Sequence, residues 1–196
     1  MKSSLSLSEK YELIFANEKQ LAKNVAADVI DKPQLELWMI LIPVFFVFYF
    51  FHLKRYKNGL KEFIRNFLIT RKRVLDATCE ATQAGKDVVV AELVDVSDAP
   101  GETKKEYQAW VTALKDFFRL LLQAQGNSYA ELVKSTYKNR TDFLLTLHKL
   151  NTAERTFNKA LTPFLPDDEG NIANVVKTME ASVEKFRRDQ ANEIFM

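Results

Sequence analysis

The chain has 196 residues and a net charge of only +2, with five glycines, five prolines, two histidines and one cysteine. This length allows one domain and an appendage, and the near-neutral charge does not favour nucleic acid as a partner. So few glycines and prolines argue against an all-β fold built on tight turns. The single cysteine excludes internal disulfides and metal sites that need several cysteines.

The first predicted element is an amphipathic helix over residues 7–31. Ser6 and Glu9 have the spacing of a capping box, and apolar residues recur at helical intervals until Asp31-Lys32-Pro33 breaks the pattern. Such a helix rests on a membrane surface or pairs with a partner, and the sequence leaves that choice open.

An apolar run follows, without one charged residue from Leu37 to Phe51. A helix over Leu35–Leu53 rises ~1.5 Å per residue and spans roughly 28 Å, close to the ~30 Å thickness of the bilayer hydrocarbon. We therefore predict a membrane helix over residues 34–54, kinked at Pro43 because an interior proline removes a hydrogen bond and clashes with the preceding turn. The residues expected inside the bilayer are Leu37, Trp38, Pro43, Phe45, Phe46, Phe48, Phe50 and Phe51.

Three alternatives compete with a full membrane span. A core helix of a soluble protein usually keeps a polar stripe, which this run lacks. A cleaved signal peptide begins with a short basic tip, whereas an acidic and basic segment precedes this run. A re-entrant segment with Pro43 at its apex is the third alternative, and the proline marks a bend in either membrane arrangement.

Basic residues dominate directly after the run, and basic residues beside a membrane tend to stay cytoplasmic. We therefore predict a single-pass protein with its C-terminal domain in the cytoplasm and its N-terminal tail outside; a re-entrant segment would leave both ends inside. The same side chains are either a plain orientation signal on a solvated helix face or ligands of anionic lipid headgroups. They are Lys54, Arg55, Lys57, Lys61 and Arg65.

The remaining sequence predicts a cytoplasmic bundle of four to five helices joined by short loops. Apolar periodicity indicates helices over about 55–84, 107–122, 128–164 and 172–186, with a possible break near residue 150, where Asn151 and Glu154 have capping-box spacing. Residues 87–96 fit a strand or a helix, and we favour a helix because a strand would have no partner. The prediction is thus an all-α protein with three parts, residues 1–33, 34–54 and 55–196.

Groups for catalysis or metal binding are scarce. The sequence has neither a glycine-rich phosphate loop nor a Glu-x-x-His pair for a di-iron site. His52 and His148 are far apart in the sequence, and Asp76 and Glu80 flank Cys79 with negative charge, which raises a thiol pKa. We therefore predict no catalytic residue, no cofactor, no metal and no small-molecule substrate.

The long apolar run predicts a membrane anchor, the periodic apolar faces predict a helical core, and groups for catalysis are few. Together these features favour a non-enzymatic scaffold, adaptor or subunit of a membrane-associated complex. Its expected partners are the lipid bilayer and other proteins, or further copies of this chain, but not nucleic acid. The alternative is a protein that binds anionic lipid or shapes the membrane with its amphipathic tail, apolar segment and basic helix.

Overall fold

The computed structural model of the chain describes residues 5–30, 43–97, 99–164 and 172–196, with the backbone alone for 43–56. All regular elements within these ranges are helical, which confirms the all-α prediction. Two short 3₁₀ turns, Gly101–Thr103 and Thr162–Phe164, lie between helices. The helices are α1 (Leu7–Val29), α3 (Pro43–Gln83), α4 (Val90–Asp95), α5 (Lys104–Gln123), α6 (Tyr129–Thr136), α7 (Arg140–Leu161) and α8 (Ile172–Phe195).

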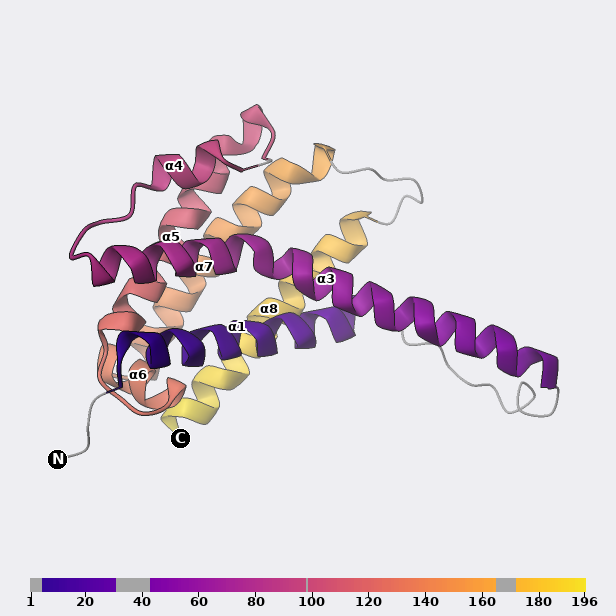
Figure 1. The fold of residues 1–196 in the computed structure, drawn as a ribbon, viewed down its shortest axis with the longest axis horizontal. Helices are drawn as coiled ribbons and strands as arrows, with labels where there is room; N and C mark the ends of the chain where they lie inside the picture. Colours follow the sequence, from indigo (N-terminus) through magenta and orange to yellow (C-terminus); the bar gives the residue numbers. More distant parts are fainter. Residues whose placement is uncertain (1–4, 31–42, 98, 165–171) are drawn as a thin grey trace.

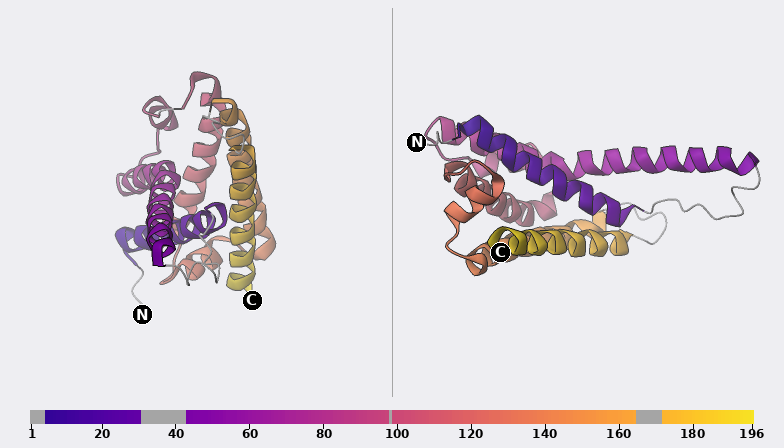
Figure 2. Two further views of the ribbon diagram at one scale, coloured as in Figure 1. Left: turned by 90° about the vertical axis from the view of Figure 1, so that its right-hand side faces the viewer. Right: turned by 90° about the horizontal axis from the view of Figure 1, so that it is seen from below.

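The long helices form a bundle of two layers. Helices α1 and α3 run side by side across a second layer formed by α5, α7 and α8 (Figure 1). Helix α3 is much longer than the others, and its N-terminal part extends well beyond the rest of the bundle (Figure 2). The bundle therefore carries one helix that continues outward as a projecting arm.

Helix α5 is the centre of the core. Its buried positions recur at the spacing of one helix face and pack between α3 and α7; they are Tyr107, Trp110, Val111, Leu114, Phe117, Phe118, Leu121 and Leu122. The Trp110 ring stacks on Phe157 of α7, with centroids 5.4 Å apart and planes 14° apart. This aromatic stripe is therefore core packing rather than an open ligand site.

Helix α1 belongs to the same bundle. Its inward face buries Ile14, Leu21 and Val25 against α3, α5 and α8, and fully burying an aliphatic side chain of this size stabilises a fold by ~1.5–3 kcal/mol. The partner of the amphipathic N-terminal helix, which the sequence left open, is therefore the bundle itself. The predicted capping box is present, since Ser6 Oγ accepts from the Glu9 N–H while a Glu9 carboxylate oxygen accepts from the Ser6 N–H at 2.8 Å.

Two predicted boundaries are wrong. Helix α7 runs through residue 150 without a break and begins at Arg140, after the capping residue Asn139, whose side chain accepts from the Asp142 N–H at 3.0 Å. The break lies instead between α6 and α7, because Tyr137 leaves the helical conformation.

Residues 87–96 contain α4, so the favoured helix is confirmed.

The predicted membrane segment falls partly outside the described ranges. Leu37 and Trp38 lie outside them, whereas Pro43 is the first residue of α3. Within the described residues Pro43 therefore starts a helix, a position where its missing N–H costs nothing, and the interior kink predicted there is not seen. Within the described ranges, no helix is both long enough and apolar enough to cross a membrane.

Candidate functional site

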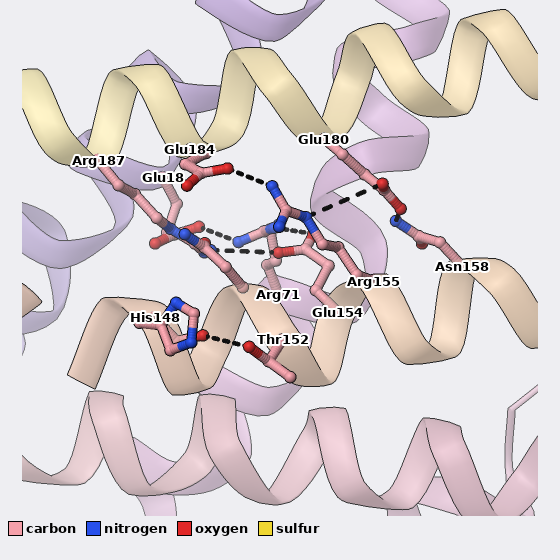
Figure 3. Close-up of polar contacts among 11 residues, drawn as sticks. Glu18, Arg71, His148, Thr152, Glu154, Arg155, Asn158, Glu180, Glu184 and Arg187 are labelled. Carbon is pink, nitrogen blue, oxygen red and sulfur yellow. Dashed lines mark hydrogen bonds and ion pairs between the residues drawn. The ribbon is translucent and has the colours of Figure 1, made fainter. Parts of the chain in front are cut away.

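A cluster of four buried charges joins four helices at the middle of the bundle (Figure 3). Arg71 of α3 donates to Glu18 of α1 at 3.0 Å and forms a short ion pair with Glu154 of α7. Arg187 of α8 donates to the other oxygen of Glu154 at 3.3 Å. All four residues are at least nine-tenths buried, so their charged groups interact with one another instead of with water.

The cluster is electrically balanced, with two guanidinium groups and two carboxylates. Burial alone raises the pKa of Glu154, but the charges of Arg71 and Arg187 and their hydrogen bonds outweigh it and hold that pKa below its ordinary value. Burial lowers the pKa of Arg187, while the carboxylates raise that of Arg71 above its ordinary value in spite of burial. Glu154 is therefore ionised at neutral pH.

This geometry does not suit acid–base catalysis. A general acid at neutral pH needs a raised carboxyl pKa, whereas that of Glu154 is lowered. The cavity beside Glu154, lined by Asn151, Arg155 and Val183 among others, has a volume of about 10 Å³, room for about one water molecule and for no substrate. We therefore assign the cluster a structural role, in which its ion pairs fix the packing of α1, α3, α7 and α8.

Sequence reasoning missed this cluster. Asn151 and Glu154 were interpreted as a possible capping box, but both lie inside α7 and bind Arg187. A charged residue on the apolar face of a predicted helix was the available signal, since Glu18 and Arg71 interrupt the inward faces of α1 and α3. No pattern in the sequence predicts which of these charged residues form ion pairs with one another.

The projecting arm of α3, residues 43–53, is the second candidate site. It carries Phe45, Phe46, Phe48, Phe50 and Phe51 on one helix, and no other described helix lies beside it (Figure 2). Its sequence has no charge between Pro43 and Lys54, and so apolar a helix is suited to contact with lipid or protein rather than with water.

The predicted headgroup ligands follow this arm directly. Lys57, Lys61 and Arg65 are exposed on α3, where the arm joins the bundle. Lys54 and Arg55 lie on the same helix in the part described by its backbone alone. The five residues therefore share one helix between the apolar arm and the core.

A groove of about 630 Å³ runs along the outer face of α3 between α1 and α4. Its apolar lining comes from Phe15, Leu68, Ile69, Ala77 and Leu93, and Ile69 is 49% exposed. Its charged lining changes sign along α3, with Arg65, Lys72 and Arg73 followed by Asp76 and Glu80. An apolar floor with charged walls is the usual form of a groove that holds an amphipathic helix.

The other polar residues considered from the sequence stay apart. His148 is exposed on α7, and Cys79 is half-buried on α3, where burial and the charges of Asp76 and Glu80 raise the pKa of its thiol. The side chain of His52 is not among those described. Within the described ranges, no three His, Cys, Asp or Glu residues lie close enough to hold a metal ion.

Glu154→Gln is expected to lower the free energy of unfolding by ~3–5 kcal/mol at pH 7, because it leaves two buried arginines short of a carboxylate. The Glu154 pKa is lower in the folded chain than its ordinary value of 4.5. Its contribution is therefore present above about pH 4.5 and lost as the pH falls through the folded pKa. Denaturant unfolding of the purified full chain between pH 3 and 8 measures both effects.

Glu184→Gln is the matched control, because Glu184 also pairs with an arginine, Arg155, but in solvent at 45% exposure. An exposed pair contributes ~0–1 kcal/mol. Equal losses for the two variants, or the same acid dependence in Glu154→Gln as in the unchanged chain, would contradict the role assigned to the cluster.

Comparison with known proteins gives no further assignment. No protein family, no curated protein and no solved structure matches this chain. The cluster, the arm and the groove are thus the features from which a function is inferred.

Proposed function

We propose that this protein is a membrane-anchored helical bundle that acts as a scaffold, an adaptor or a subunit of a membrane-associated complex, without enzymatic activity. The anchor is the apolar run that ends in the arm of α3. The bundle is cytoplasmic, because basic residues follow the run. The proposal covers both forms of anchor that the sequence allows, a full span and a re-entrant segment.

The observation that carries the proposal is the separation of two apolar surfaces. Among the residues with described side chains, the core is centred on α5, and the arm of α3 extends away from the other described helices (Figure 1). Hydrocarbon is the environment in which an uncovered helix of this composition is stable, because all its interior backbone groups are hydrogen-bonded within the helix.

The groove on α3 is the surface where we place a protein partner, an amphipathic helix with an apolar stripe. Charge complementarity requires acidic residues beside Arg65 and Arg73 and basic residues beside Glu80. A second copy fits less well. Antiparallel pairing of two α3 helices matches the charges but points the two arms in opposite directions, and parallel pairing sets like charges against each other.

The anchor is tested by Phe46→Arg combined with Phe50→Arg. Each arginine at the centre of a membrane segment costs ~2.5–3.5 kcal/mol on insertion scales, so the double variant is expected to move from the membrane pellet to the supernatant. High-speed centrifugation of a detergent-free lysate with quantitative immunodetection measures the shift.

The control for this experiment is Leu120→Arg with Leu145→Arg, two exposed leucines of the bundle. This variant carries the same added charge and should remain in the pellet with the unchanged chain. Recovery of the unchanged chain in the supernatant as a monomer would overturn the membrane anchor.

The groove is tested by Ile69→Glu, which places a charge on its apolar floor. A loss of ~1.4 kcal/mol in binding reduces occupancy of a weak complex about tenfold. We therefore expect membrane proteins that co-purify with the tagged full chain from solubilised membranes to fall by at least about that factor, as measured by quantitative mass spectrometry.

Leu145→Glu is the matched control, because Leu145 is similarly exposed, at 56%, but lies on α7 away from the groove. Equal recovery of partners with both variants would exclude the groove as the docking surface. Recovery of the unchanged chain alone and monomeric would count against the scaffold function altogether.

The alternative function is direct binding of anionic lipid, and the exposed positions of Lys57, Lys61 and Arg65 beside the arm favour it. Each basic residue near an acidic leaflet contributes ~1 kcal/mol. In this alternative the bilayer itself is the partner, and the groove has no role.

Charge reversal of Lys54, Arg55 and Lys57 to glutamate separates the two functions. If lipid is the ligand, binding to liposomes rises with their phosphatidylserine content and this variant loses that dependence. The control reverses three exposed lysines away from the arm: Lys105 on α5, Lys134 on α6 and Lys138 in the loop between α6 and α7. The lipid-binding function would be excluded if the co-sedimented fraction changed neither with the anionic lipid content nor with charge reversal at the three positions.

A further inference from the structure

The position of α1 decides between the two forms of membrane anchor. Side-chain hydrogen bonds and an ion pair hold this helix against the rest of the bundle along its length. Tyr11 donates to Asp76 of α3 at 2.6 Å, Glu18 accepts from Arg71 at 3.0 Å, and Asp28 accepts from Ser182 of α8 at 2.6 Å. The contacts reach nearly to the last residue of α1, so the helix is fixed at both ends.

The chain leaves the bundle and returns to it at one place. Helix α1 ends at Val29, and the next residue, Ile30, lies against α3, where a Cβ on Gly59 would be 3.8 Å from Ile30 Cδ1. The apolar run and the arm of α3 lie between these two neighbours in the chain. Ile30 and Gly59 therefore lie at the same point of the bundle.

A full span is incompatible with this contact. It separates the two ends of the crossing segment by the ~30 Å of the hydrocarbon core, whereas Ile30 and Gly59 are neighbours. Moving α1 to the opposite face would remove Glu18 from Arg71 and expose Ile14, Leu21 and Val25, all of which are buried. The buried ion pair and the core of the bundle would both be incomplete.

The geometry points to a re-entrant membrane anchor: α1 and the packed part of the bundle, from Gly59 of α3 to α8, lie on one face of the membrane, because Ile30 and Gly59 are neighbours and α1 is part of the core. This inference rests on the proposed membrane anchor and replaces the predicted single span. It also changes the predicted position of the N-terminal tail, which lies beside the C-terminal domain and not across the membrane from it.

Cysteine labelling in sealed membrane vesicles tests the re-entrant anchor. In a Cys79→Ser background, Ser8→Cys reports α1 and Ala109→Cys reports the bundle, because both positions are exposed. Glu12→Cys, also exposed on α1, is a second reporter in case a thiol at the start of the helix disturbs its cap. A membrane-impermeant maleimide is applied to vesicles of each orientation before and after detergent.

The re-entrant anchor requires that the α1 and α5 reporters be labelled on the same face and protected together on the opposite face until detergent is added. Labelling on opposite faces would overturn the re-entrant form and leave the membrane anchor in place as a full span. Recovery of the chains in the supernatant before labelling would overturn the membrane anchor in either form, so the two failures are distinct.

Discussion

The fold depends on Arg71, whose guanidinium group lies at the point where four helices meet. Two carboxylates from α1 and α7 neutralise it, and Arg187 from α8 shares the second of them. Taking four charges out of water is unfavourable, and the ion pairs repay this only when all partners are in place. A displaced α1, α7 or α8 would leave a buried charge without its counterpart. The cluster therefore favours one arrangement of these helices over others that bury a similar apolar area.

The same residue connects the core to the arm, because Arg71 and the arm belong to one helix. Helix α3 is continuous from Pro43 to Gln83, and the other described helices pack only on its C-terminal part. A continuous helix transmits its direction, so the packing around Arg71 also sets the angle at which the arm leaves the bundle. In the proposed arrangement, the membrane therefore holds the bundle in a defined orientation and not at the end of a loose linker.

Local signals in the sequence predicted the helices and several of their ends. Ser6 and Glu9 cap α1 as their spacing indicated, because a capping box is formed by residues three positions apart and needs no distant partner. The periodic apolar face of α5 likewise predicted the centre of the core.

The same reasoning failed where distant residues compete for a side chain. Asn151 and Glu154 have the spacing of a cap, yet Arg187, more than thirty positions further on, binds both of them. The helix then continues through them, since their side chains serve the bundle and not the local backbone. The contact between Ile30 and Gly59 could not be predicted from the sequence either, because it depends on how α1 packs against α3.

Chain order adds a constraint on how such a re-entrant anchor is formed. The apolar run lies near the N-terminus, whereas Ser182 and Arg187, which complete the packing around α1, lie in the last helix. During synthesis the run emerges long before α8 exists to hold α1. A segment that crossed the membrane in that interval would carry α1 away from its partners for good. A re-entrant segment keeps α1 on the side of synthesis, where α8 can still close the core, and the charges along α1 that would resist transfer through hydrocarbon act in the same direction.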